Sequence, residues 1–322
     1  MNTINWYPGH MKKTRELIEA HLKLVDIVCE VCDARIPASS RNPIIEELTA
    51  GKTRILLLNK SDLADESATE RWIEFFRKKE GGAKGFAALA MNAMSGQGVN
   101  TLMKRLERIA AEKAASGTTK AGIPVRMLIA GIPNSGKSSL INRLTGRRAA
   151  QVGDRPGVTR GKQWLTLENG MQLLDTPGIL WPKFEDQQVG LKLAFCGSIR
   201  DEIMDIQDLG LELIRTLLAD HAGLLTERYG FGNDIAIDED KSEDRGEDRG
   251  RFCVLAEDAE PSPVFDQDVS ADEALGCMEA IARKRGFILQ GGRIDYERTA
   301  RMVLDEFRGG KIGRITLETP PK

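Results

Sequence analysis

Eight consecutive residues carry the clearest chemical signal in the chain. Gly131-Ile-Pro-Asn-Ser-Gly-Lys-Ser138 fits G-x-x-x-x-G-K-[S/T] and stands between an apolar run, 125–130, and a helix-like run, 139–144. Glycines let such a loop curl until successive N–H groups point into one concavity, and the following helix adds its positive dipole end. A Gly/Ser-rich turn could match by chance, but this context favours a phosphate-binding loop. Its expected nucleotide contacts are Pro133, Asn134, Ser135, Gly136, Lys137, Ser138 and Ser139.

Two of these side chains have specific expected roles. Lys137 should reach the outer phosphates and assist catalysis, and the Ser138 hydroxyl should coordinate Mg²⁺. Downstream, Asp175-Thr-Pro-Gly178 fits D-x-x-G. It offers Asp175 as an acidic group near Mg²⁺ and the Gly178 N–H as a γ-phosphate contact, although Asp175 could instead cap a turn. Thr159 lies in a turn-rich segment and is the candidate for a second, mobile Mg²⁺ hydroxyl.

A second motif indicates which base is bound. Asn59-Lys60-Ser61-Asp62 fits N-K-x-D and follows the apolar run 55–58. A carboxylate at Asp62 can accept from both the ring N–H and the exocyclic amine of guanine, a pair of donors that adenine does not offer. Asn59 could bond the other purine edge, and the stem of Lys60 could lie along the ring. The loop at Asn92-Ala93 is a further candidate contact. Beside a phosphate-binding loop, this string predicts a guanine nucleotide.

The elements that must position these residues alternate between strands and helices. Buried strands are predicted at 27–32, 55–58, 86–91 and 125–130, and a hairpin at 162–167 and 171–174, with a helix over 99–115. The alternation predicts an α/β fold: a mostly parallel sheet with helices on both faces. Ligands of such sheets bind beyond the carboxyl ends of the strands, where N-K-x-D and the phosphate loop stand.

Beyond Gly178 the pattern becomes helical. Helices are predicted at 185–195, at 208–219, after the capping-box pair Ser270 and Glu273, and over 295–307, with a strand at 312–317. We therefore expect a GTPase-like domain at 1–182 and a smaller, mostly helical domain at 183–322. An acidic stretch, about 231–268, reads as a mobile insertion within the latter, and an inert solvated loop is the favoured interpretation.

Composition limits the remaining possibilities. The net charge of −2 over 322 residues argues against a protein that coats nucleic acid with its whole surface. Five cysteines, an odd number, indicate a reducing compartment without a disulfide partner, and Cys29 and Cys32 read as buried strand residues rather than a metal or redox pair. Neither a signal peptide nor a membrane span is evident, so a cytoplasmic protein without a membrane partner is expected.

Residues 281–322 are locally basic, with ten Lys/Arg against five Asp/Glu. Such a surface could contact phosphate backbones, although an Arg-rich helical face is also commonly just solvated. The candidate RNA-binding residues are Arg283, Lys284, Arg285, Arg293, Arg298 and Arg301.

The motif order is unusual, since N-K-x-D and Asn92-Ala93 precede the phosphate loop. The chain thus resembles a circularly permuted GTPase, and it is similar to the bacterial ribosome-biogenesis GTPase A family, the YlqF-like proteins. The likeness rests on Trp6-Tyr-Pro-Gly-His-Met11, Asp33-Ala-Arg-Ile-Pro37, Ser40-Arg-Asn-Pro43, the phosphate loop, and the run from Asp175 through Lys183. It departs at 234–262, so no function is carried onto that stretch.

The resemblance implies a GTPase that binds the precursor of the large ribosomal subunit, promotes its late assembly, leaves after hydrolysis, and contacts rRNA through its C-terminal domain. Two alternatives stay open: an RNA-binding assembly scaffold with negligible turnover, and a GTPase of small-subunit assembly.

Catalysis needs a group that the usual site has and this chain lacks. Regulatory GTPases place Gln directly after D-x-x-G to orient the attacking water, whereas this chain has Ile179. His10 lies on a predicted loop and is the candidate for that task, since the resemblance to similar proteins implies that this His is used there. The alternative is a histidine with a structural role in the loop. Asn134 resembles the Asn with which related GTPases bind K⁺ beside the phosphates. We therefore expect GTP as substrate, with Mg²⁺ and K⁺ as cofactors.

Overall fold

The computed structural model describes residues 22–49, 51–80, 85–116, 124–146, 164–175, 186–201, 204–230 and 269–321. The chain forms two compact units. The sheet unit comprises residues 1–205 and 307–322, and the helical unit comprises residues 206–306. This division differs from the expected boundary at 182, because the first helix after D-x-x-G and the last residues of the chain both belong to the sheet unit.

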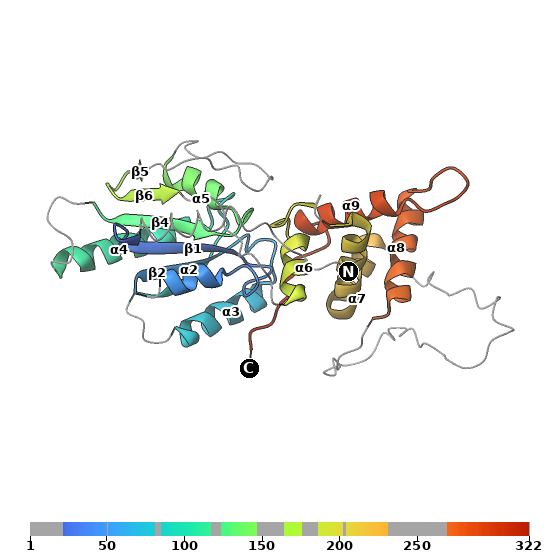
Figure 1. Ribbon diagram of the computed structural model, residues 1–322, viewed down its shortest axis with the longest axis horizontal. Coiled ribbons are helices and arrows are strands. Elements are labelled where there is room, and N and C mark those ends of the chain that lie inside the picture. The colour runs from blue at the N-terminus through green and yellow to red at the C-terminus, as the bar shows by residue number, and fades with distance from the viewer. Residues whose placement is uncertain are drawn as a thin grey trace. The chain divides into compact units, whose positions relative to one another are not determined.

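A six-stranded sheet forms the centre of the sheet unit, in the order β3-β2-β1-β4-β6-β5 (Figure 1). Every neighbouring pair is parallel except β5 and β6, which form an antiparallel hairpin. The predicted strands and the hairpin are therefore present. Their bounds are β1 Ile27–Asp33, β2 Thr53–Asn59, β3 Ala87–Ala90, β4 Arg126–Gly131, β5 Trp164–Thr166 and β6 Gln172–Asp175.

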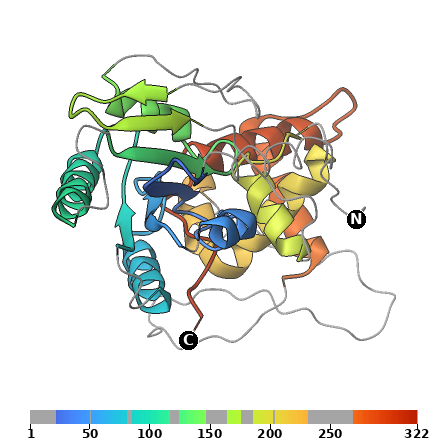
Figure 2. The ribbon, with the colours of Figure 1, turned by 60° about the vertical axis from the view of Figure 1, so that its left-hand side comes forward.

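Helices cover both faces of this sheet, as predicted. Successive strand residues point to opposite faces, so one face of β1 presents Ile27, Cys29 and Val31 to α4 and α5, while the other packs on α2 and α3. In Figures 1 and 2, α4 is teal and α3 is cyan. The sheet-unit helices are α2 Pro43–Leu48, α3 Glu66–Lys79, α4 Val99–Ala115, α5 Lys137–Leu144 and α6 Gln187–Phe195.

The prediction that Cys29 and Cys32 are buried residues of a strand is confirmed, since both lie in β1 and are buried. Cys29 belongs to the apolar cluster under α4, and Cys32 to the cluster on α3 across the sheet. Burial raises the pKa of Cys29 to about 12 and that of Cys32 well above its ordinary value. Among the described residues, no three His, Cys, Asp or Glu side chains are grouped as metal ligands.

In the described residues of the helical unit the helices are α7 Ile206–Tyr229, α8 Ala271–Arg285 and α9 Tyr296–Arg308. The last two residues of α9 lie in the sheet unit. α8 begins at the predicted capping box: Ser270 Oγ accepts from Glu273 N at 3.1 Å, and Glu273 Oε2 accepts from Ser270 N at 2.8 Å. α7 is longer than predicted and has a non-helical backbone at His221. Within the described ranges, no helix has the length and apolar character needed to cross a bilayer.

The predicted strand at 312–317 is wrong. Residues 309–321, here called the tail, form neither helix nor strand, although Ile312, Ile315 and Leu317 are buried. Their apolar spacing reflects burial of these side chains within the sheet unit and not pairing with a strand.

Candidate functional site

The phosphate loop joins β4 to α5 with the backbone that its glycines allow. Gly131 and Gly136 have φ values of +148° and +95°. A Cβ at Gly131 would lie 2.3 Å from the carbonyl oxygen of Val31, and one at Gly136 would lie 2.1 Å from Nδ2 of Asn59. Neither position has room for a side chain, so the loop requires glycine at both, and it leads directly into the N-terminus of α5, the kind of helix end at which anions bind.

The loop's own polar side chains fold inward in this structure. Lys137 Nζ donates to the carbonyl oxygen of Ile132 at 2.7 Å, and Ser135 Oγ donates to the same oxygen at 3.0 Å. Lys137 is only 6% exposed. A buried ammonium needs an acceptor, and the loop carbonyl provides one.

Asn59 connects the two motifs that sequence reasoning assigned to one nucleotide. Its Nδ2 donates to the carbonyl oxygen of Ser135 in the phosphate loop at 2.7 Å, and its Oδ1 accepts from Ala93 N at 2.9 Å. The side chain is buried. Asn59 therefore ties the N-K-x-D turn, the phosphate loop and the 92–93 loop together, in addition to any contact with a purine.

Lys60 is held by a buried carboxylate. Its Nζ lies 2.9 Å from Oδ2 of Asp33, whose two oxygens also accept from Nε and Nη2 of Arg35 at 2.9 and 2.8 Å. Burial alone would raise the pKa of Asp33, but the charges and hydrogen bonds of Arg35 and Lys60 outweigh it and keep the pKa well below its ordinary value. Lys60 also has a positive φ of 60°, so its backbone conformation needs such support.

Asp62 stands on the turn that follows Lys60, with an exposed side chain. Ser61 fixes the start of this turn, because both its N and its Oγ donate to the carbonyl oxygen of Met91, at 3.1 and 3.0 Å. The carboxylate that we expect to read guanine is thus carried by a braced backbone.

Asn92 shapes its own loop. Its Oδ1 accepts from Met94 N at 2.8 Å and Ser95 N at 3.0 Å. The N–H of Ala93 is already bonded to Asn59. In this structure both residues of the predicted contact loop therefore serve its conformation.

Asn134, the candidate K⁺ ligand, has φ of 56° and donates from Nδ2 to the carbonyl oxygen of Gly197 at 2.7 Å. Gly197 follows α6 closely in sequence. The carboxamide oxygen, which would face a cation, is the opposite end of the same group.

Four further predicted site residues lie wholly or partly outside the part of the chain that the structure describes. His10, Thr159 and Gly178 lie outside the described residues, and of Asp175 the structure describes the backbone alone. That backbone ends β6 opposite Ile129 of β4, so Asp175 leaves the sheet at the edge from which the phosphate loop begins. Ser138, Thr159 and Asp175 would each offer Mg²⁺ a side-chain oxygen, the type of ligand that this ion prefers.

Comparison with known proteins decides the family. A family model described as 50S ribosome-binding GTPase matches residues 126–226. Ribosome biogenesis GTPase A of Bacillus cereus is 42% identical over 98% of this chain and 94% of its own length. The chain belongs to the ribosome biogenesis GTPase A family. The Thermotoga maritima protein of that name is 32% identical over 98% of this chain and 95% of its own.

Solved structures agree. GNP-bound YlqF from T. maritima has a TM-score of 0.59 and 28% identity, covering 96% of this chain and 99% of that one; the GDP-bound YlqF structure has the same score and identity, covering 94% and 99%. The chain is therefore a GTPase whose domain is circularly permuted, since N-K-x-D at 59–62 precedes the phosphate loop at 131–138.

Sequence reasoning assigned no role to several residues that position this family's site. Asp33 and Arg35 were visible as a charged pair directly after a buried strand, which is a usable signal. Nothing in the sequence indicated what Gly197 and the tail contact, because their bonds to Asn134 and to the N-K-x-D turn join residues far apart in the chain.

Proposed function

We propose that this GTPase hydrolyses GTP to GDP and phosphate during late assembly of the large ribosomal subunit, in the cytoplasm. The observation that carries the nucleotide assignment is the Asn59 bridge, which joins the N-K-x-D turn to the phosphate loop through hydrogen bonds of 2.7 and 2.9 Å. Family membership supports the ribosomal role, because the relatives are named ribosome biogenesis GTPases.

Each residue of the site has a part in this proposal. Asp62 accepts from the guanine ring N–H and exocyclic amine, and Lys60, anchored by Asp33, lies along the base. The N–H groups of the phosphate loop bind the β- and γ-phosphates, and Lys137 exchanges its bond to Ile132 for phosphate oxygens. The Gly178 N–H bonds the γ-phosphate.

Two cations complete the site. Ser138, Thr159 and Asp175 would hold Mg²⁺, which neutralises charge on the phosphate oxygens when it is bound. The carboxamide oxygen of Asn134 would face K⁺ beside the β- and γ-phosphates. His10 orients the attacking water, the task that Ile179 cannot perform because it lacks a polar side chain.

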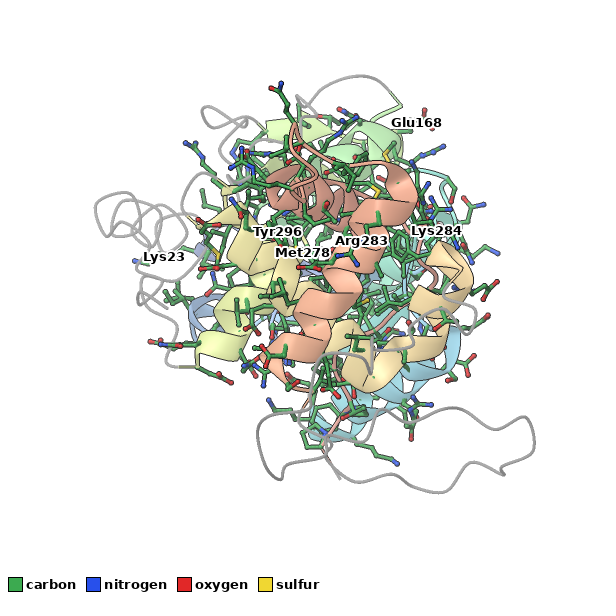
Figure 3. All side chains as sticks on the ribbon, turned by 90° about the vertical axis from the view of Figure 1, so that its right-hand side faces the viewer. Lys23, Glu168, Met278, Arg283, Lys284 and Tyr296 are labelled. Carbon is green, nitrogen blue, oxygen red and sulfur yellow. The ribbon has the colours of Figure 1, made fainter. Side chains whose placement is uncertain are left out.

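The helical unit is proposed to contact rRNA. All six candidate residues are exposed, and Figure 3 shows Arg283 and Lys284 on α8. Arg283 pairs with Glu279 at 3.1 Å and Arg301 pairs with Glu297 at 2.8 Å, in each case a carboxylate one helical turn away. Exposed pairs of this kind contribute little stability, so their guanidinium groups can turn to phosphates. Arg293 and Arg298 are the remaining phosphate candidates.

Arg285 has a structural part as well. It lies 3.4 Å from Glu306, which also binds Arg228 at 2.7 Å, and it stacks over the ring of Tyr229 at 5.6 Å. Hydrogen bonding to Arg228 leads the causes that lower the pKa of Glu306. Replacing Arg285 would therefore disturb the helical unit. Arg283→Ala with Lys284→Ala should weaken rRNA binding and reduce its salt slope by about 2, while it also removes the 2.6 Å hydrogen bond from Lys284 Nζ to the carbonyl oxygen of Gly230. An unchanged slope would remove α8 from the interface.

The central experiment is steady-state GTP hydrolysis in K⁺ or Na⁺ buffer, alone and with purified large or small ribosomal subunits. We expect stimulation by large subunits that requires K⁺ and is lost in His10→Ala, with GTP still bound by the variant. Stimulation by small subunits alone would contradict the large-subunit assignment, and full activity of His10→Ala would contradict the role of His10.

A further inference from the structure

The tail supplies bonds to the turn that carries Asp62. Arg314 donates from Nε to the carbonyl oxygen of Ala64 at 2.8 Å and from Nη2 to that of Ser61 at 3.1 Å. One guanidinium thus joins the two ends of a four-residue stretch, with Asp62 inside it. Its remaining nitrogen, Nη1, lies 3.3 Å from Oε2 of Glu66 at the start of α3.

The next two tail residues continue the same attachment. Ile315 N donates to the carbonyl oxygen of Leu63 at 3.0 Å, and Thr316 Oγ1 accepts from Asp65 N at 3.1 Å. Ile315 and Thr316 are both buried. Three consecutive tail residues therefore bond the backbone of Ser61, Leu63, Ala64 and Asp65.

The tail is itself anchored further along. Leu317 N donates to the carbonyl oxygen of Arg35 at 2.8 Å, and the carbonyl oxygen of Glu318 accepts from Trp72 Nε1 at 3.0 Å. The Glu318 carboxylate accepts from Ala38 N at 2.7 Å. Because these partners follow β1 or lie in α3, the tail is fixed to the same sheet edge as the guanine turn.

Support from outside is what this turn requires. Lys60 has a positive φ, a conformation that costs free energy for a residue with a side chain and persists only where the surroundings impose it. Recognition of a base by two parallel hydrogen bonds also demands a carboxylate held at a fixed angle. On the other side of the turn, the carbonyl oxygen of Met91 accepts from Ser61; on this side the tail provides the bonds.

We propose that Arg314 is a positioning residue for guanine selection, which fixes, with Ile315 and Thr316, the turn that presents Asp62. This inference rests on the proposed role of Asp62 as the base-reading carboxylate. It gives the last residues of the chain a function in nucleotide choice, although they follow the helical unit in sequence.

The test compares affinity for GDP and for inosine diphosphate, which lacks the exocyclic amine, by fluorescence or calorimetric titration. In Arg314→Ala we expect the Kd for GDP to rise about tenfold and that for inosine diphosphate to rise less, so that discrimination falls about threefold. Arg314→Lys, with one donor group at its end, should be intermediate. Thr316→Val, which keeps the shape and removes the acceptor, should shift the ratio in the same direction.

Two reference variants make the outcomes distinct. Arg108→Ala, on the exposed face of α4 where Arg108 pairs with Glu112 at 2.8 Å, should leave both affinities unchanged. Asp62→Ala should abolish the discrimination. If it does not, the assignment of Asp62 itself fails. If Asp62→Ala abolishes it while every folded Arg314 and Thr316 variant, judged by circular dichroism, keeps the wild-type ratio, the inference about the tail is overturned.

Discussion

At the scale of residues, the site depends on side chains that serve other side chains. Asp33 illustrates this: it is 1% exposed and bonded to Arg35 and Lys60. The Asn59 side chain likewise joins two loops, through its hydrogen bonds to Ser135 and Ala93. The sequence predicted that Asn59, Lys60 and Lys137 lie at one site, because motif spacing carries that information. It did not predict that Asn59 bonds Ser135 and Ala93, since such contacts arise only when distant loops meet.

Asp33→Asn should lower stability and change its pH dependence. The pKa of Asp33 is depressed in the folded protein, so the stability it contributes is present above the unfolded pKa, about 4, and is lost as pH falls through the lower folded value. Removing the charge leaves Arg35 buried without its partner, which costs about 3–5 kcal/mol at pH 7. Urea unfolding followed by tryptophan fluorescence measures this.

The two tryptophans that the structure describes, Trp72 and Trp164, both belong to the sheet unit, so that signal reports on the unit containing Asp33. The acid-induced loss of stability between about pH 5 and pH 2 should be shallower in Asp33→Asn than in wild type. Parallel pH curves for the two proteins would show that Asp33 is not the group responsible.

At the scale of elements, short sequence patterns predicted the strands, the hairpin and the helix start that depend on neighbouring residues. The buried strands, the β5–β6 hairpin and the capping box of α8 follow from apolar runs, turn residues and the Ser270–Glu273 spacing. The tail was misread as a strand, because apolar spacing shows that residues 312–317 are buried and extended without showing what they bond. Arg314 and Ile315 bond the turn after β2 rather than a strand.

Packing of α7 against α9 should be sensitive to a single methyl group. A Cβ at Gly210 would lie 2.5 Å from Cβ of Ala300, whereas one at Gly276 of α8 would have nothing within 4 Å. Gly210→Ala should therefore destabilise the helical unit by about 1–3 kcal/mol. Gly276→Ala, the matched control, should stabilise it by about 0.5–1 kcal/mol through helix propensity.

Thermal unfolding by circular dichroism reports the helices of both units, whereas tryptophan fluorescence reports the sheet unit, so a change seen in the first signal and not in the second belongs to the helical unit. We expect the Gly210→Ala effect in the first signal only. Equal shifts in the two variants would show that α7 and α9 do not approach as closely as Gly210 and Ala300 indicate.

At the scale of the whole molecule, segments that lie together in the site are far apart in the sequence. The base-reading turn comes from residues 59–62 and the phosphate loop from residues 131–138, while the tail that braces the turn comes from the last residues. The sequence predicted the permuted order, because motifs can be recognised in any order. It did not place the tail in the sheet unit, because the helical unit is inserted before it.

The central claim is that Asp62, from the first part of the chain, selects the base of the nucleotide whose phosphates bind the later loop. The most direct measurement is the affinity of Asp62→Asn for guanosine and xanthosine diphosphates. Xanthine carries an oxygen where guanine carries the amine, so a carboxamide can donate where the carboxylate accepted. We predict that GDP binding weakens about 100-fold and that xanthosine diphosphate becomes the preferred ligand.

Asp65→Asn is the matched control for this measurement. Asp65 caps α3 by accepting from Ala68 N at 2.6 Å, and Asn caps helices equally well, so this variant should keep the preference of the wild type for GDP. If Asp62→Asn also keeps that preference, with GDP affinity unchanged, Asp62 does not read the base and the account of this site is contradicted.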